Sequence, residues 1–367
     1  MLKSAKHLLI GSTESHSGKS TLSVALGTRL QAMGFQVGWG KPLASTESIG
    51  SAPDNSTDTD LNFIPKMLSL PPEQQLPTLF SLGQQTLAEQ LGNGAPISFA
   101  ADLERYWEQA KGDVLLVEGP STLEEGGLLK LSLPEIAAAL DASALLVMRF
   151  NTHCMVDQLI SAQKRLGKAL LGVILNEVGE DDAHFATETV VPYLEKQGIP
   201  VLATLPKLPF LGSIRVSELI KHLDAEVLCC DDHLDLVVES LKIGAMNVNA
   251  ALRFFGQGMH QAVVTGGDRR DLQIAALETS THCLILTGQI APSKDVIALA
   301  QDKEVPILSV ATDTLTTVER IDRLFGCISL NNPDKVPLIK DVLAKEVDIE
   351  RLSSLMGLEI PAIAPHS

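Results

Sequence analysis

The sequence contains little cysteine and comparatively few basic residues. Its five cysteines include no CxxC pair and no metal-ligand spacing, so we expect reduced, mostly buried thiols instead of disulfides or a cysteine metal site. The 29 basic residues are outnumbered by 45 acidic ones, and the net charge is −16. This balance argues against nucleic acid or an anionic membrane as the main partner, and its simplest interpretation is solubility.

Long apolar runs are missing as well. The most apolar stretch, residues 137–150, is interrupted by Asp141 and is too short to cross a bilayer. Residues 1–7 include no apolar segment of signal-peptide length before the first expected strand. We therefore expect a cytoplasmic protein without a membrane partner.

The overall composition is typical of a globular protein. Apolar residues make up 45% of the chain and charged residues 20%, a balance typical of well-packed domains. A chain of 367 residues exceeds the usual size of one hydrophobic core, so two domains are expected. Trp39 and Trp107 are interpreted as packing residues, because no basic or aromatic cluster accompanies them.

Short apolar runs alternate with helical patterns through the first two hundred residues. Near-continuous apolar strands separated by helices predict an α/β fold, with a parallel sheet covered on both faces. Strands are expected at residues 8–10, 35–39, 114–117, 144–150, 170–175 and 201–205, and helices at 155–166 and 186–197.

A glycine loop follows the first expected strand and leads into an amphipathic helical pattern at residues 21–33. It ends in Gly18-Lys19-Ser20, and such a loop places backbone N–H groups and a helix N-terminus against a phosphate. The lysine reaches the outer phosphates and the serine hydroxyl can hold Mg²⁺. Six residues separate Gly11 from Gly18, where four is usual. The predicted phosphate-binding residues are Ser17, Gly18, Lys19, Ser20 and Thr21.

Three further polar residues each come directly after an expected strand. They are Lys41, Glu118 and Asn176. Ligands of parallel sheets bind at the carboxyl ends of the strands, so this shared placement favours one binding site. Separately, each has a simpler interpretation: a solvated loop lysine, a helix cap and a turn asparagine.

The second part of the chain begins after residues 206–212, which carry two prolines and a glycine and read as a linker. A smaller alternation follows, with helices between short strands. Those strands are expected at residues 226–229, 262–265, 283–286 and 306–310.

One loop of this second part resembles an anion site. Gly266 and Gly267 let the backbone turn and expose N–H groups, and Asp268 is placed to cap a helix expected to begin there. Arg269 or Arg270 would offer further donors to a phosphate or carboxylate. We predict a ligand pocket or a two-fold subunit interface at this loop. The alternative is a tight connection with solvated arginines.

Taken in order, these motifs resemble the dethiobiotin-synthetase-like domain at the front of long phosphate acetyltransferases, followed by a DRTGG domain. The resemblance covers about residues 6–324. The motifs that carry it are Gly18-Lys19-Ser20, Gly40-Lys41-Pro42, Val117-Glu118-Gly119, Leu175-Asn176-Glu177 and residues 203–206, then residues 263–269 and 286–288.

The resemblance implies three regions. Residues 1–206 would form a P-loop parallel sheet flanked by helices, residues 213–328 a smaller α/β DRTGG-type regulatory domain, and residues 329–367 a helical C-terminal tail. The sequence does not decide what the tail packs against. The acetyltransferase domain that comes next in the long enzymes is absent from this sequence, so acetyl transfer is not expected.

The resemblance also implies ATP and Mg²⁺ as ligands. Ser20 and Glu118 would hold the metal, with Asp58 or Asp60 as a further acidic residue, a donor set that suits Mg²⁺. Asn176 would contact the adenine edge. Lys41 matches a lysine that lies beside the reacting groups of the synthetase.

Departures from the synthetase pattern fall in its substrate half. His16 replaces an acidic residue of the loop, Ala95-Pro96-Ile97 replaces an Ala-Pro-His element, and residues 120–122 replace a glycine-rich stretch. Nucleotide binding without the ligase reaction is the natural inference.

The leading hypothesis is therefore a regulatory protein that binds ATP and Mg²⁺. Its second domain would sense a small-molecule ligand, contact a protein partner or form a homo-oligomer. One alternative is an ATP-dependent ligase, carboxylase or amidase of the dethiobiotin synthetase or cobyrinic acid a,c-diamide synthase type, with Lys41 as its catalytic residue. Another is a switch ATPase that acts on a partner protein.

Overall fold

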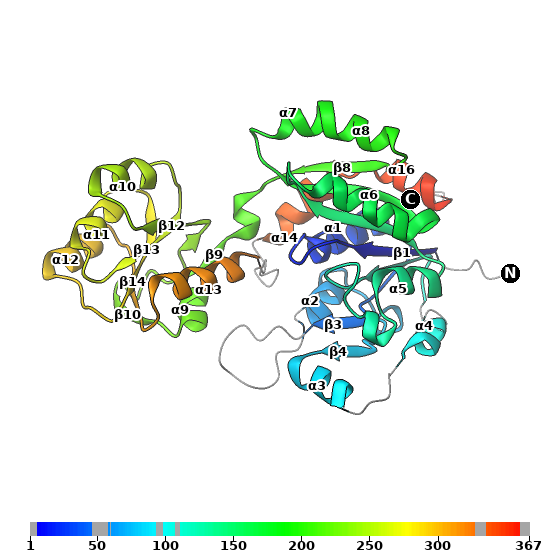
Figure 1. The fold of residues 1–367 in the computed structure, drawn as a ribbon, viewed down its shortest axis with the longest axis horizontal. Helices are drawn as coiled ribbons and strands as arrows, with labels where there is room; N and C mark the ends of the chain where they lie inside the picture. Colours follow the sequence, from blue (N-terminus) through cyan, green and yellow to red (C-terminus); the bar gives the residue numbers. More distant parts are fainter. Residues whose placement is uncertain are drawn as a thin grey trace, which may run out of the picture. The chain divides into compact units, whose positions relative to one another are not determined.

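The computed structural model describes residues 6–45, 58, 60–92, 98–106, 111–326 and 335–359. Within these residues the chain forms two compact units. The first combines the residues up to 207 with residues 335–359, and the second consists of residues 208–326 (Figure 1). The tail, whose packing the sequence left open, thus belongs to the first unit.

The first unit contains a six-stranded sheet in which every pairing is parallel. The chain builds the sheet on one side of β1 and then crosses to the other side. A crevice for ligands forms at the carboxyl ends of strands at such a crossing point. The order is β2 (Val37–Gly40), β5 (Val114–Glu118), β1 (Lys6–Gly11), β6 (Ser143–Arg149), β7 (Leu170–Val178) and β8 (Val201–Pro206).

Helices cover both faces of this sheet, which confirms the predicted fold class (Figure 1). The central strands are apolar along almost their whole length because both of their faces are buried; all five residues of β5 are buried. The helices are α1 (Lys19–Ala32), α2 (Asp60–Met67), α3 (Gln84–Gly92), α4 (Ala100–Tyr106), α5 (Leu133–Ala139), α6 (Met155–Leu166), α7 (Ala183–Phe185) and α8 (Val191–Lys196).

The helix α1 has less exposed surface than its amphipathic pattern suggested. Only Arg29 and Ala32, near its end, are exposed. Gly27 allows close packing here, since a Cβ atom at this position would lie 2.6 Å from the Leu68 Cδ1 atom. The reason for the burial is that α2 and two parts of the tail, a π-helical turn at Ile339–Leu343 and α15 (Ala344–Glu346), pack on α1.

The remaining tail helices are α14 (Lys335–Leu338) and α16 (Ile349–Met356). The Asp348 N–H donates to the Leu202 carbonyl at 2.9 Å, which ties the start of α16 to β8. Arg351 donates to both carboxylate oxygens of Glu195, at 2.8 Å each. These contacts join residues about 150 positions apart in the sequence.

A short parallel pair, β3 (Leu43–Ser45) and β4 (Phe80–Leu82), was not expected from the sequence. Several sequence features lie outside the described residues. They are Ala95-Pro96-Ile97, Trp107 and most of the polar stretch between residues 45 and 60. No helix among the described residues is both long and apolar enough to span a membrane.

The second unit contains a five-stranded sheet. Four strands are parallel and β10 runs antiparallel at one edge. The other edge strand, β12, was not anticipated from the sequence. The order is β10 (Glu226–Cys229), β15 (Ile307–Val310), β14 (Thr281–Thr287), β13 (Gln261–Gly266) and β12 (Ser240–Gly244). Its helices are α9 (Val216–Leu223), α10 (Val248–Phe255), α11 (Arg270–Leu277), α12 (Lys294–Asp302) and α13 (Thr314–Gly326), and β9 (Ile214–Arg215) pairs with β11 (Val237–Val238).

Candidate functional site

The glycine loop connects the carboxyl end of β1 to the first turn of α1. Gly18 stands at the N-cap with a φ of 98°, a conformation that favours glycine. A Cβ atom there would also lie 2.5 Å from the Asn176 Nδ2 atom. The same Nδ2 donates to the Ser17 carbonyl at 2.8 Å, so the asparagine at the end of the distant strand β7 holds the loop in place. Asn176 thus lies at the phosphate loop itself.

An acidic residue of the loop, Glu14, anchors it to β6. Its carboxylate accepts hydrogen bonds from the Arg149 backbone N–H at 3.1 Å and from the Arg149 guanidinium at 3.0 Å. The hydrogen bond to Glu14 raises the pKa of Arg149. Neither residue was identified from the sequence. The available signal was that Arg149 is the second-to-last residue of an expected strand, whereas Lys41 and Asn176 come just after theirs.

The loop presents polar groups that are costly to bury without a partner. The Lys19 side chain is only 8% exposed, and this burial lowers its pKa, although the nearby Glu118 acts in the opposite direction. The Ser17 hydroxyl is buried and has no hydrogen-bond partner among the described residues. Because buried polar groups are usually hydrogen-bonded, this hydroxyl could serve as a donor to a ligand of the loop.

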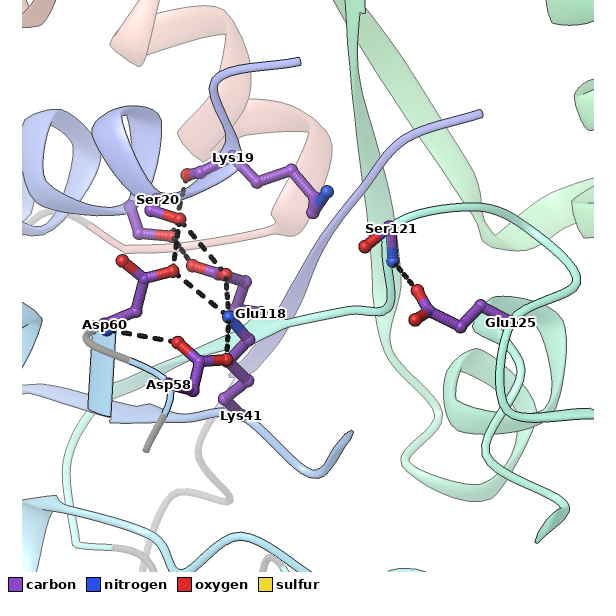
Figure 2. A network of polar contacts seen from close by, with 9 residues as sticks. Lys19, Ser20, Lys41, Asp58, Asp60, Glu118, Ser121 and Glu125 are labelled. Atoms are coloured by element: carbon purple, nitrogen blue, oxygen red, sulfur yellow. Dashed lines mark hydrogen bonds and ion pairs between the residues drawn. The ribbon is translucent and has the colours of Figure 1, made fainter. Parts of the chain in front are cut away.

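The carboxyl edge of the sheet brings four of the other predicted residues together. The Lys41 Nζ atom lies 2.7 Å from an Asp58 oxygen, 2.9 Å from Glu118 Oε1 and 3.1 Å from Asp60 Oδ2 (Figure 2). Burial by itself lowers the pKa of Lys41, but the three carboxylates outweigh it and raise this pKa above the ordinary range. The ammonium group therefore stays charged.

The loop hydroxyl joins the same cluster. Ser20 Oγ donates to Asp60 Oδ2 at 2.8 Å and to Glu118 Oε1 at 3.2 Å (Figure 2). Ser23, one turn further along α1, approaches Glu118 Oε2 at 3.4 Å and was not predicted. Glu118 is 1% exposed, and burial raises the pKa of its carboxyl group despite the lysines beside it.

The residues around Ser20 fit a magnesium ion. In an octahedral Mg²⁺ site, neighbouring oxygens lie about 2.9 Å apart, given metal–oxygen distances of about 2.0–2.1 Å. The spacings from Ser20 to Asp60 and Glu118 bracket this value. Among the described residues, no group of three or more His, Cys, Asp or Glu side chains is arranged to hold a metal ion unaided. A Mg²⁺ ion here would need the serine, water and phosphate oxygens, which is how Mg²⁺ usually binds nucleotides.

The loop of the second unit is already hydrogen-bonded within itself. The Gly267 N–H donates to the Thr287 carbonyl at 3.0 Å and the Arg269 N–H to the Gly266 carbonyl at 3.1 Å. The side chain of Gln273 donates to both glycine carbonyls. Two of the amides expected to face an anion are therefore engaged.

The helix after this loop begins one or two residues later than predicted. It starts at Arg270 with Arg269 at the N-cap, so Asp268 is not the cap. The guanidinium of Arg269 bonds to Asp271 and to the Met246 carbonyl, and the arginine is thus not simply solvated. Gly267 is required sterically, because a Cβ atom would lie 2.3 Å from the Ile290 carbonyl oxygen. The geometry favours the tight connection, and the anion site stays a prediction.

A central parallel strand, a glycine loop and a buried helix N-terminus define a P-loop fold. A family model described as an AAA domain matches residues 6–215, more than half of the chain, and one described as a DRTGG domain matches residues 218–324. The chain belongs to this AAA-domain family, of the dethiobiotin-synthetase-like P-loop type, and carries a DRTGG domain after it. The predicted resemblance is confirmed.

Known relatives are phosphate acetyltransferases. The chain is 26% identical to that of Pseudomonas putida over 371 residues, which cover 95% of this chain and 51% of the relative. It is 25% identical to that of Nitratidesulfovibrio vulgaris over 373 residues, again covering 95% and 51%. The chain thus spans about half the length of these relatives and matches their N-terminal half.

Solved structures with some likeness include a nucleotide-binding protein from Archaeoglobus fulgidus in complex with ADP, with a TM-score of 0.34 and 16% identity over 55% of this chain and 82% of that one. A second structure contains the CBS and DRTGG domains of a Clostridium perfringens pyrophosphatase, complexed with diadenosine tetraphosphate. Its TM-score is 0.29, with 18% identity over 38% of this chain and 71% of that one. At these scores, neither ligand carries over to this chain.

Proposed function

We propose that the protein is a regulatory protein that binds ATP with Mg²⁺ in its first unit and responds to a ligand, or forms a homo-oligomer, through its DRTGG domain. The observation that carries the proposal is the hydrogen bonding of the P-loop serine Ser20 to the carboxylates of Asp60 and Glu118 at one sheet edge, next to the buried Lys19. Acetyl transfer, the activity named for the relatives, is not part of the proposal.

Each residue has a separate role in the proposed complex. Lys19 and the loop amides would bind the phosphates, and Ser20, Asp60 and Glu118 would hold Mg²⁺ together with water. Asn176 uses its Nδ2 on the Ser17 carbonyl, which leaves Oδ1 as an acceptor for the adenine amino group. Bound Mg²⁺ would offset phosphate charge.

Calorimetric titration with ATP tests the proposal, in the presence and absence of Mg²⁺. We expect binding that is tighter with Mg²⁺ and that is lost in Lys19→Ala. The exposed Lys66 in α2 gives a matched control, since Lys66→Ala removes the same charge away from the loop. No binding at millimolar ATP would contradict the proposal.

The role of the second unit is tested through Arg269. If its loop serves a ligand pocket or a two-fold interface, Arg269→Ala should change sedimentation or a metabolite-binding profile while ATP binding persists. Arg253→Ala, at an exposed arginine of α10 outside the loop, is the matched control. Identical behaviour of both variants and the parent would identify the loop as a connection only.

A second candidate is the ATP-dependent ligase. Lys41 lies beside Glu118 and Asp60, near the phosphate loop, where a cation would stabilise charge that develops in phosphoryl transfer. Phosphate release that depends on a small acid or diamine and disappears in Lys41→Ala would favour this candidate. The absence of such release leaves the regulatory proposal in first place.

A further inference from the structure

The three ion pairs of Lys41 occupy its ammonium group at the place where Mg²⁺ would bind. An ammonium group has three N–H donors, and the three carboxylates within 3.1 Å account for all of them. The side chain is 12% exposed, so water does not compete freely for this group. In this arrangement Lys41 has no remaining donor for a phosphate or a substrate.

Lys41 contacts the same oxygen atoms that a magnesium ion would need. Asp60 Oδ2 and Glu118 Oε1 are the two oxygens next to Ser20, and both also lie against Lys41 Nζ. An ion about 2.1 Å from Glu118 Oε1 would lie within about 5 Å of the ammonium, which is 2.9 Å from that oxygen. Two cations so close in a buried site repel each other strongly.

We propose that Lys41 is an internal counter-ion that takes the place of the divalent cation before nucleotide binds. When Mg²⁺ enters, Lys41 withdraws from Glu118 and Asp60 and keeps its pair with Asp58. This inference rests on the proposed nucleotide function and specifies how that site is regulated.

Charge explains why the exchange would require the nucleotide. The Lys41 ammonium already sits among the carboxyl groups of Asp58, Asp60 and Glu118. A Mg²⁺ ion alone would add two positive charges beside this ammonium in a largely buried site, which is costly. The phosphates supply the missing negative charge. Metal and nucleotide therefore bind together, and Mg²⁺ alone is rejected.

The exchange would also reach the start of α2. Asp60 is the first residue of this helix, and its N–H donates to Asp58 Oδ1 at 3.1 Å. Lys41 links these two residues to the ends of β2 and β5. Its withdrawal from Asp60 and Glu118 would loosen the link between the first residue of α2 and the end of β5.

The test measures Mn²⁺ binding by electron paramagnetic resonance in the absence of nucleotide. The parent should bind Mn²⁺ weakly, and Lys41→Met should bind it at least about tenfold more tightly because the competing charge is removed. Lys41→Arg keeps the charge and should bind Mn²⁺ as weakly as the parent. Lys66→Met is the control for a general change in net charge and should also match the parent.

A second variant guards against unfolding, since Lys41→Met leaves three buried carboxylates without their counter-ion. In Lys41→Met/Asp58→Asn one of those charges is removed, and Ser20, Asp60 and Glu118 remain. This variant should also bind Mn²⁺ more tightly than the parent, and Mn²⁺ should raise its melting temperature more. If the folded double variant binds Mn²⁺ no more tightly than the parent, Lys41 is not a competing counter-ion.

The outcomes of this test and of the ATP titration are separate. Tighter Mn²⁺ binding in the variants supports the counter-ion even if the parent binds no ATP, in which case only the nucleotide function fails. ATP binding by the parent with unchanged Mn²⁺ affinity in Lys41→Met and Lys41→Met/Asp58→Asn overturns the counter-ion alone.

Discussion

Lys19 and Ser20 are neighbours at the start of α1, yet in the proposed complex they would serve different parts of the nucleotide. The lysine is nearly buried in the loop, and the serine hydroxyl is directed at carboxylates from α2 and β5. Substitutions at the two ends of this arrangement should therefore separate phosphate binding from metal binding.

Lys19→Ala should reduce ATP affinity without unfolding the protein. A charged hydrogen bond of this kind contributes about 1.5–3 kcal/mol, so the dissociation constant should rise at least about tenfold. The fold should tolerate the change, because burial already disfavours the charged lysine. Titration calorimetry measures the affinity and circular dichroism the fold. An unchanged dissociation constant would remove the phosphate role from this loop.

Glu118→Gln should weaken ATP binding with Mg²⁺ more than binding without it. The substitution preserves shape but removes a charge that Mg²⁺ prefers. Two parallel ATP titrations, with Mg²⁺ and with a chelator, give the comparison. Equal losses in the two series would mean that Glu118 mainly organises Lys41, Ser20 and Ser23.

At the scale of elements, a partly exposed ion pair helps to hold the tail helix α16 in place. Arg351 binds both oxygens of Glu195 and also donates to the Val201 carbonyl at 3.2 Å. Pairs with this degree of exposure contribute about 0.2–1 kcal/mol. Arg351→Met should therefore lower the free energy of unfolding by up to about 1 kcal/mol, measurable by urea denaturation.

The pH dependence of that loss has a defined sign. The hydrogen bond from Arg351 lowers the pKa of Glu195, so the folded state releases this proton more easily than the unfolded chain. The contribution is complete above the unfolded pKa of about 4.3 and is lost as the pH falls through the lower folded value. The stability difference between the parent and Arg351→Met should persist at pH 7 and shrink toward pH 3. A difference that grows on acidification would contradict this assignment.

At the scale of the whole molecule, the first unit is built from two stretches of chain that are far apart in sequence. Residues 335–359 bury apolar side chains on α1 and β8, including Ile339, Ile349 and Leu352. Burying one such side chain contributes about 1.5–3 kcal/mol. A fragment that ends at residue 207 lacks the tail, so the face of α1 that packs against the tail becomes exposed to solvent.

We expect that fragment to be several kcal/mol less stable than a form in which residues 208–329 are replaced by a flexible glycine–serine linker. Urea denaturation of the two forms measures the difference, and ATP titration shows whether the site survives in each. Equal stabilities would mean that the tail is not an integral part of the first unit.

Local sequence patterns were sufficient to predict the strands and the loop that position the site. The strands β1, β5 and β7 are short apolar runs, and each must be buried on both faces wherever it is placed. The residues at their carboxyl ends then share one edge of the sheet, which is why Glu118 and Asn176 could be assigned to a common site before the fold was known. The glycine loop could be predicted from its own sequence, because Gly18-Lys19-Ser20 after an apolar strand is a recognisable pattern.

The tertiary structure decided what those residues contact. Lys41 pairs with three carboxylates, Glu14 with Arg149 and Asn176 with the loop carbonyl of Ser17, and each partner comes from a different element. The solvent face expected for α1 is likewise covered by a tail more than 300 residues later. The periodicity of apolar residues along the sequence predicts only which face of a helix or strand is buried. Which distant group meets a charge, or covers a helix, is set by chain topology and packing.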